Sequence, residues 1–212
     1  MVEGRPDPRV NVIIHKDFET YDEKVLAQLK GAAGCVWALG VAQSPALRPH
    51  LILVPDYVQI TKTCAEAAAK ALSKLSGTES TGGDTTTKPG LLTAFQARIK
   101  GETELSLGAI CRSSHLQGYS VRIFYPDMAG HDAIKPYIAP RPLVHSVAEA
   151  VLGAPIRHFA KNLWAPTDKL GEFLVEVAMG RHDADIDAAD GQESVDGLTI
   201  ISNADIRRVK GY

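Results

Sequence analysis

An apolar run near the start of the chain, Val10-Asn11-Val12-Ile13-Ile14-His15-Lys16-Asp17-Phe18, has the composition of a buried strand and ends in an acid. An amphipathic stretch follows at 21–30, and a second apolar run, Cys35-Val36-Trp37-Ala38-Leu39, stops at Gly40. The order strand, helix, strand is typical of a parallel nucleotide-binding sheet. We therefore predict an α/β fold: a Rossmann-like parallel sheet of four or five strands with helices on both faces.

The glycine-rich loop that binds phosphate in such folds is missing from its usual place. That loop follows the first strand and opens the first helix. No G-x-G-x-x-G motif precedes residue 10. The sequence therefore predicts a dinucleotide-type fold that lacks the first βαβ unit and its phosphate-binding glycine loop.

The size and composition of the chain indicate one globular domain. The 212 residues are 45% hydrophobic and 23% charged, which is ordinary for a soluble protein. We predict a single domain over 1–212, with a sheet core at 10–126, a small substrate-side helical lobe at 127–180, and a closing strand and helix at 181–212.

Charge and cysteine content exclude several classes of function. A formal net charge of −2 disfavours nucleic acid or an anionic membrane as the main partner. No stretch reaches the roughly 18 apolar residues of a membrane span, and the first residues lack the apolar core of a signal peptide. The three cysteines, Cys35, Cys64 and Cys111, form no metal pattern and suit a reducing compartment. These features predict a cytoplasmic protein without a metal.

The remaining elements follow from periodicity and from breaker residues. Apolar residues at helical spacing predict three helices, and short apolar runs predict two further strands. Stretches rich in Ser, Thr, Gly or acidic residues predict loops, and Asn203 is a candidate cap for a last short helix. The predicted helices are 57–75, 91–107 (continuing to about 112) and 165–179, the strands 119–125 and 198–202, and the loops 77–90 and 183–197.

A few residues could carry chemistry, each with a simpler structural explanation. Asp17 with Phe18 could meet an adenine at the end of a parallel strand, or be an ordinary polar strand end. Gly40 could admit a ligand to the backbone, or serve a tight turn. Lys100 could donate to ribose hydroxyls and lower the pKa of a nearby phenol, or be solvated and paired with Glu104.

Hydroxyl and imidazole side chains offer weaker signals. Ser80 and Thr81 lie in the loop before the second long helix, where a hydroxyl could contact a substrate oxygen. No histidine pair has metal-ligand spacing, and no Ser, His and Asp residues are recognisable as a catalytic triad.

Taken together, the chain resembles the atypical short-chain dehydrogenase/reductase group, in particular its fungal nucleoside-diphosphate-sugar-epimerase-like members. The resemblance covers roughly residues 10 to 210 and rests on the order and spacing of several segments rather than on one strict motif. These segments are His15-Lys-Asp-Phe18, Cys35-Val-Trp-Ala-Leu-Gly40, Tyr57-Val-Gln-Ile-Thr61, Ala67-Ala-Ala-Lys-Ala-Leu72, Thr87-Lys-Pro-Gly90, Arg98-Ile-Lys-Gly-Glu-Thr-Glu104, Tyr119-Ser-Val-Arg122 and Asn203-Ala-Asp-Ile-Arg207.

The resemblance implies that NAD or NADP binds at the carboxyl edge of the sheet. It places Asp17 and Phe18 by the adenine, and Ala38, Leu39 and Gly40 along the ribose and phosphate. It also assigns Lys100 to the nicotinamide ribose and places Arg122 and Ile123 after the strand that flanks the nicotinamide. Because the region after that strand covers the active site in this family, the candidate substrate contacts are Asp127, His131, Asp132 and Lys135.

The chain departs from the family pattern where catalysis would occur. The family's Tyr-x-x-x-Lys motif would place a tyrosine at position 96, and this chain has Gln96. An amide cannot supply the phenolate that general acid–base hydride chemistry needs. The strand expected to carry a catalytic serine is missing, and 43–56 resembles an insertion.

Two hypotheses follow. In the first, the chain is an NAD(P)-dependent reductase or isomerase of a small metabolite, with Lys100 orienting the cofactor and Ser80 or Thr81 replacing the tyrosine. In the second, it is a degenerate member that binds a metabolite or a protein partner without turnover, with exposed apolar surface that favours a homodimer.

Overall fold

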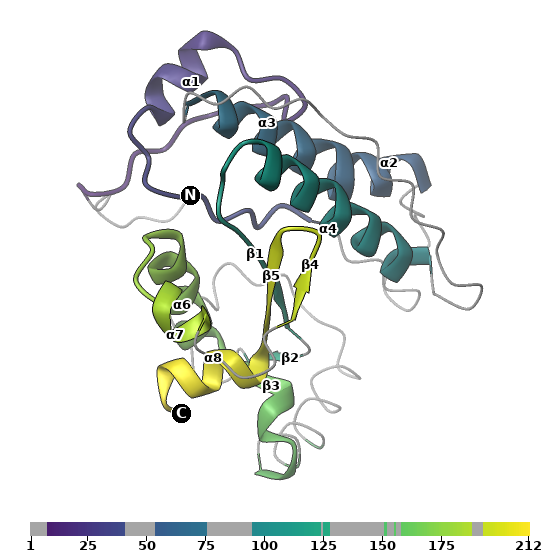
Figure 1. Cartoon of the computed structure of the whole chain (residues 1–212), viewed down its shortest axis with the longest axis vertical. Helices are drawn as coiled ribbons and strands as arrows, with labels where there is room; N and C mark the ends of the chain where they lie inside the picture. The colour runs from purple at the N-terminus through teal and green to yellow at the C-terminus, as the bar shows by residue number, and fades with distance from the viewer. Residues whose placement is uncertain are drawn as a thin grey trace. The chain divides into compact units, whose positions relative to one another are not determined.

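The computed structural model describes residues 8–40, 54–75, 95–123, 125–127, 151, 155, 158–187 and 193–212. Contacts within the chain group these residues into two compact units. The first unit contains 1–32 and 39–116, and the second contains 33–38 and 117–212. The ribbon of each unit is shown in Figure 1.

The regular elements described in the first unit are helices. It contains α1 (Glu23–Leu29), α2 (Val54–Val58), the π-helical turn η1 (Gln59–Thr63), α3 (Cys64–Leu75) and α4 (Phe95–Ser113).

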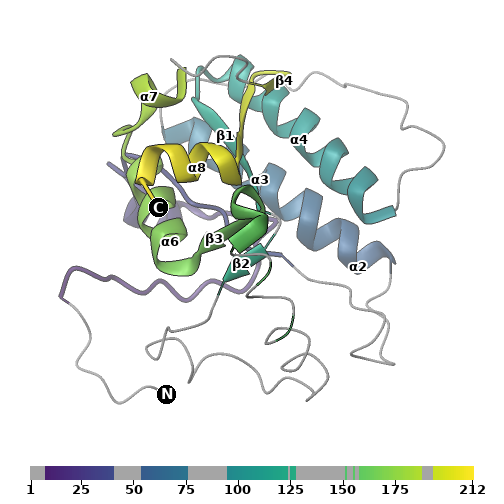
Figure 2. The ribbon, with the colours of Figure 1, turned by 90° about the horizontal axis from the view of Figure 1, so that it is seen from below.

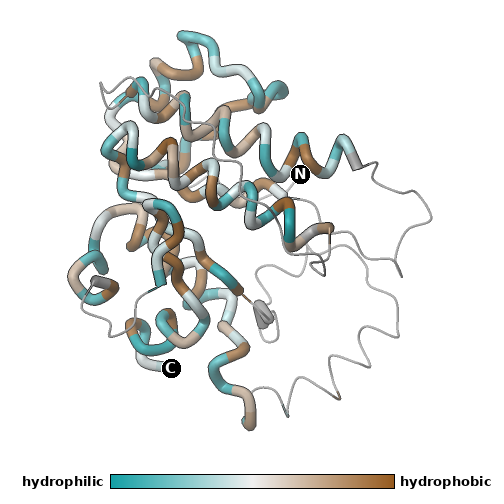
Figure 3. The backbone as a smooth tube through the Cα atoms, turned by 45° about the vertical axis from the view of Figure 1, so that its right-hand side comes forward, coloured by the Kyte–Doolittle hydropathy of each residue, from teal (hydrophilic) through white to brown (hydrophobic). Residues whose placement is uncertain are grey.

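Helices α3 and α4 pack side by side (Figures 1 and 2). Several small residues of α3 are buried, among them Ala65 and Ala68. Their short side chains let the two helices approach each other closely. Ile99 and Ile110 are buried apolar residues of α4. In Figure 3 the helical tubes of this unit alternate between hydrophobic and hydrophilic segments, as amphipathic helices do.

The second unit is built on short strands with helices between them. Its elements are β1 (Gly118–Arg122), β2 (Tyr125–Asp127), η3 (Lys161–Leu163), β3 (Trp164–Pro166), α6 (Thr167–Ala178), α7 (Asp183–Asp187), β4 (Ser194–Val195), β5 (Leu198–Ser202) and α8 (Asn203–Lys210). A three-stranded sheet has the order β1-β5-β4, and β2 pairs with β3 in a separate two-stranded sheet. The β1–β5 and β2–β3 pairs are parallel, and β4–β5 is antiparallel.

The core of the second unit is formed by β3 and β5 together with the helices α6, α7 and α8. Its buried members come from β3, α6, α7, β5 and α8: Ala165, Leu170, Phe173, Val177, Ile186, Ile201 and Ile206. Leu198 and Ile200 alternate with Ile201 along β5 and are also buried. Both faces of β5 are therefore covered, as is typical of a strand in a parallel pair.

A tight hairpin joins β4 to β5. Val195 pairs with Leu198, so the loop is the dipeptide Asp196-Gly197. Both residues have positive φ, 52° and 96°. Such a turn favours Asp-Gly because glycine adopts positive φ without a steric cost.

The α/β class predicted from the sequence is confirmed, and most elements fall where periodicity placed them. The strand at 198–202 is found with the same bounds, and the helices at 57–75 and 91–112 correspond to α2–η1–α3 and α4. Three details differ. The strand predicted at 119–125 ends at Arg122, and Tyr125 begins β2. Ala165 and Pro166 belong to β3 rather than to α6, and Ser202 rather than Asn203 caps α8. The prediction of a loop over all of 183–197 is wrong, because this segment begins with α7 and ends with β4 and its hairpin.

The prediction of strands at 10–18 and 35–39 is wrong. These segments carry no strand hydrogen bonding in the structure. Val10, Val12 and Ile14 are 62%, 73% and 82% exposed. An apolar run becomes a buried strand only when a neighbouring strand pairs with it, and no described residue does so here.

The described strands form smaller sheets than the predicted parallel sheet of four or five strands. The Rossmann-like arrangement and the single-domain division at 126 and 180 stay predictions.

Candidate functional site

The carboxyl ends of β1 and β5 form the edge at which ligands bind in parallel sheets. Arg122 ends β1 and lies directly across from Ser202, which ends β5. Arg122 is half-exposed, and its Nη1 lies 3.2 Å from Oε1 of Glu193, beside β4. This edge therefore holds one exposed cation and one hydroxyl next to the start of α8.

The first turn of α8 is tightly capped. The hydroxyl of Ser202 accepts a hydrogen bond from the backbone N–H of Asp205, at 3.4 Å. In return, the carboxylate of Asp205 accepts from the N–H of Ser202 at 2.9 Å and from its hydroxyl at 2.7 Å. This reciprocal capping box holds the chain where β5 turns into α8.

Asn203, the first residue of α8, is unusual for its position. Its side chain is only 3% exposed, yet neither its carbonyl oxygen nor its amide nitrogen has a hydrogen-bond partner among the described residues. An unpaired buried amide lowers stability by about 1–3 kcal/mol. A buried amide without a partner is a candidate for contact with a water molecule or a ligand.

The turn that contains Asp17 is stabilised by its own side chains. The carboxylate of Asp17 accepts from the N–H of Glu19 at 3.0 Å and from the hydroxyl of Thr20 at 2.7 Å. These bonds, the one from Thr20 first, lower the pKa of Asp17 below its ordinary value. His15 Nε2 lies 2.9 Å from the carbonyl of Thr20, and its ring packs against Phe18 and Tyr21. In the structure this acid therefore organises a turn.

Lys100 lies exposed on α4, one helical turn after position 96. The helix preserves the spacing that brings the two positions of the Tyr-x-x-x-Lys motif to one face. The charged neighbours of Lys100 on this helix pair with each other: Arg98 lies 3.8 Å from Glu102, and Lys62 of η1 lies 3.7 Å from the same carboxyl group.

The predicted site residues divide between the two units. The first unit holds Asp17, Phe18, Leu39, Gly40 and Lys100, and the second holds Ala38, Arg122, Ile123 and Asp127. Three adjacent pairs of them, Asp17 with Phe18, Leu39 with Gly40 and Arg122 with Ile123, are neighbours within one segment. Ile123 packs against the core of the second unit. Ser80, Thr81, His131, Asp132 and Lys135 lie outside the described residues.

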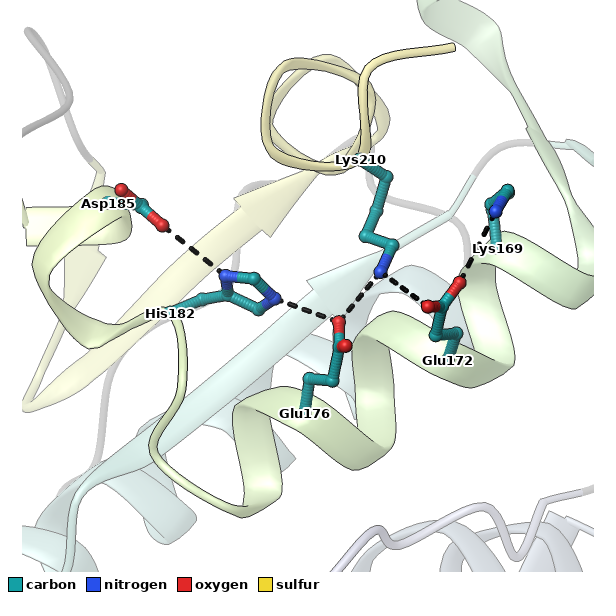
Figure 4. A network of polar contacts seen from close by, with 6 residues as sticks. All are labelled: Lys169, Glu172, Glu176, His182, Asp185 and Lys210. Atoms are coloured by element: carbon teal, nitrogen blue, oxygen red, sulfur yellow. Dashed lines mark hydrogen bonds and ion pairs between the residues drawn. The ribbon is translucent and has the colours of Figure 1, made fainter.

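A network of charged side chains that sequence reasoning missed joins α6 to α8 (Figure 4). Glu176 accepts from Lys210 Nζ at 2.7 Å and contacts His182 Nε2 at 2.9 Å. Lys210 also lies 3.1 Å from Glu172, and Asp185 lies 3.3 Å from the other ring nitrogen of His182. His182 and Asp185 are three positions apart, as are Lys169 and Glu172, and such spacing was the available sequence signal. The contact of Lys210 with Glu176 spans 34 positions and has no local signal.

This network has the properties of a structural cluster. The pKa of Glu176 falls from 4.5 to about 2, first because Lys210 donates to it and then because His182 does. The same contacts raise the pKa of Lys210. Both ring nitrogens of His182 already contact carboxylates, so the ring is engaged on both sides and the cluster ties α6, α7 and α8 together.

The described residues hold no group of three or more His, Cys, Asp or Glu side chains that could bind a metal ion. Within the same residues, no helix combines the length and apolar content that crossing a bilayer requires. Burial raises the pKa of the Cys35 and Cys111 thiols, and also that of Cys64, where the charge of Glu19 adds to the effect. A raised pKa makes a thiol a poorer nucleophile at neutral pH.

The fold and this edge define an α/β protein with a parallel strand pair and a polar carboxyl edge. The chain matches no protein-family model and no solved structure. It is 39% identical over 127 residues to the Botcinic acid biosynthesis cluster B protein 16 of Botryotinia fuckeliana, an alignment that covers 59% of this chain and 80% of that protein. The chain belongs to the family of that protein.

A second relative is more distant but is matched over more of the chain. The Leucinostatins biosynthesis cluster protein T of Purpureocillium lilacinum is 26% identical over 202 residues, which cover 85% of this chain and 72% of that protein.

Proposed function

We propose that this chain is an NAD(P)-binding protein of the atypical short-chain dehydrogenase/reductase type that acts in the biosynthesis of a small metabolite. The names of its two relatives place them in biosynthesis clusters, which supports a role in small-molecule metabolism. The observation that carries the proposal is the carboxyl edge of the β1–β5 pair, where Arg122 and Ser202 face each other beside the unpaired amide of Asn203.

The residues at this edge fit the groups of a dinucleotide. The guanidinium of Arg122 suits a phosphate oxygen, because it is a permanent cation with several donors. The amide of Asn203 both donates and accepts, as a carboxamide or a ribose hydroxyl requires, and it is unpaired among the described residues. Asp17 belongs to the other unit, and both of its carboxylate oxygens already accept hydrogen bonds within its own turn.

When bound, the dinucleotide supplies or accepts a hydride. The residues of this edge would bind and orient it: Arg122 by charge, and Asn203 by its paired donor and acceptor. A reductase or isomerase also needs a residue that holds a proton for the reacting oxygen, and Gln96 cannot do this.

Gln96 supports a second candidate, a non-catalytic member that binds the metabolite or cofactor without turnover. Since α4 keeps positions 96 and 100 one turn apart, the helix retains the motif's spacing and lacks only its phenol. On this account, Gln96→Tyr supplies the missing group, and NADPH oxidation with a panel of ketones would increase at least tenfold over the unaltered chain.

The test is titration of the full chain with NADPH and NADH, followed by fluorescence and calorimetry. We expect saturable micromolar binding, weakened at least tenfold by Arg122→Ala and by Asn203→Leu. Arg181→Ala is the control, because it removes an exposed cation of the same unit that lies away from this edge. Loss of binding in Asn203→Leu should come with equal or higher thermal stability, since an unpaired buried amide is removed.

A folded chain that binds neither cofactor up to millimolar concentration would refute the proposal. Equal losses in Arg122→Ala and Arg181→Ala would also refute the assignment of the site to this edge.

A further inference from the structure

A cleft in the first unit lies outside every site assigned so far. It has a volume of about 440 Å³, which is within the usual size of small-molecule sites. Its two walls are the segment 19–26, which leads into α1, and one face of η1 and α3. Figure 1 shows α1 and α3 close to each other in this unit. We propose that this cleft binds a small amphipathic carboxylic acid.

The helical wall presents one continuous stripe to the cleft. Its residues recur every three or four positions, which places them on a single helical face: Thr63, Glu66, Ala67, Lys70, Ala71 and Lys74. The short side chains of the two alanines leave open space in the middle of the cleft. Tyr21 and Leu26 stand on the opposite wall, so the centre of the cleft is apolar.

The two ends of the cleft carry opposite charge. Lys70 and Lys74 lie one turn apart, are both exposed, and form no ion pair among the described residues. The other end holds the carboxylates of Glu19 and Glu66 with the hydroxyls of Thr20 and Thr63. From Glu66 to Lys74 the helix rises about 12 Å, which matches the length of a two-ring organic acid.

The acidic end is held in place before any ligand arrives. Gln59, in the π-helical turn η1, donates its side-chain amide to the carboxylate of Glu19 on the opposite wall. The turn that carries Glu19 and Thr20 is itself locked by the carboxylate of Asp17. π-helical turns are rare and occur frequently at functional sites, and this one contributes Thr63 to the cleft.

The distribution of charge selects the chemistry of the ligand. The two lysine ammonium groups attract one carboxylate, the apolar middle takes a flat carbon skeleton, and the acidic end favours a neutral hydrogen-bond donor such as a hydroxyl group. A diacid is disfavoured because its second carboxylate would meet Glu19 and Glu66. The cleft thus selects a hydroxylated monocarboxylic acid of metabolite size.

The probe is a fluorescent hydroxynaphthoate whose carboxylate and hydroxyl lie at opposite ends of the ring system, compared with its neutral methyl ester. We expect the full chain to bind one equivalent of the acid, with the ester at least tenfold weaker. The double variant Lys70→Met/Lys74→Met should bind the acid at least tenfold more weakly and the ester as before. The matched control is Lys16→Met/Lys24→Met, which removes two exposed lysines of the same unit outside the cleft and should change neither affinity.

A variant that fills the cleft gives an independent check. Ala67→Trp, with unchanged circular dichroism, should weaken the acid and the ester alike. The proposal is overturned if the folded chain binds no acid up to millimolar concentration, if acid and ester bind equally, or if the lysine double variant binds the acid as the unaltered chain does.

Discussion

Glu176 shows how a single side chain can connect several elements. Its carboxylate lies on α6 and contacts Lys210 of α8 and His182, the residue before α7. These contacts favour the ionised form and lower its pKa to about 2. A carboxyl group whose pKa is depressed on folding stabilises the native state above its ordinary pKa, and this stabilisation is lost as the pH falls through the folded value.

Glu176→Gln should therefore lower the free energy of unfolding at neutral pH and flatten its dependence on pH between about 4.5 and 2. The check is urea denaturation followed by circular dichroism across this range. Asp185→Asn is the matched variant, because its carboxylate is mostly exposed and its contact with His182 is longer, at 3.3 Å. Equal acid sensitivity in the two variants would contradict the assignment to Glu176.

Gly34 is required for a close approach of two backbone segments. A Cβ atom at this position would overlap the carbonyl of Ala178 at the end of α6. Gly34→Ala should thus destabilise the protein by about 1–3 kcal/mol, as overpacking does. Gly101→Ala is the control, because a Cβ atom added there on α4 would meet nothing within 4 Å, and alanine should stabilise the helix by about 0.5–1 kcal/mol. Thermal denaturation of both variants shows whether each substitution raises or lowers the stability.

At the scale of elements, the transition from β5 to α8 depends on one cap. Ser202 both ends the strand and begins the helix, and its reciprocal bonds with Asp205 satisfy polar groups that the first helical turn leaves free. The same residue faces Arg122 across the parallel pair. This junction therefore fixes the geometry of the proposed cofactor edge.

Ser202→Ala should lower the free energy of unfolding by about 1 kcal/mol, the usual effect of losing an N-cap. Ser194→Ala, on the exposed strand β4, serves as control and should change stability by less than about 0.5 kcal/mol. Chemical denaturation measures both. A loss that is no larger than the control's would show that Asp205 holds the first turn of α8 without the hydroxyl.

At the scale of the whole molecule, the described residues form two cores made from different parts of the chain. Tyr57, Ile99 and Ile110 are buried in the first unit, and Phe173, Ile201 and Ile206 in the second. Phe173 is fully buried and also stacks on the ring of His182, with centroids 5.7 Å apart. A substitution at Phe173 therefore removes packing contacts directly from the second core alone.

Phe173→Ala should cost about 3–5 kcal/mol and raise amide hydrogen exchange in α6, β5 and α8. Exchange in α3 and α4 should stay as in the unaltered chain, because their buried residues belong to the other unit. Mass spectrometry of exchanged peptides makes the comparison. Equal acceleration in both units would show that they unfold as one.

Local sequence was sufficient for the long helices and for β5. Helical periodicity predicted α4 and the continuous run from α2 to α3, and the apolar run 198–202 predicted β5, because these patterns determine which face of an element can be buried. Of the proposed cofactor edge, the family resemblance implied Arg122. Asn203 was predicted only as a helix cap. Local sequence does not reveal whether an amide side chain will be buried without a hydrogen-bond partner.

Only the tertiary structure decided which apolar runs became strands and where charged groups met. Residues 10–18 have the composition of a strand as much as 198–202 do, but hydrogen-bonded pairing requires a neighbour, and in the structure β5 has one on each side. In the same way, Lys210 meets Glu176 across 34 positions of sequence, and Glu19 meets Gln59 across 40. Periodicity reports the local preference of the backbone, whereas pairing and ion contacts depend on which distant segments fold together.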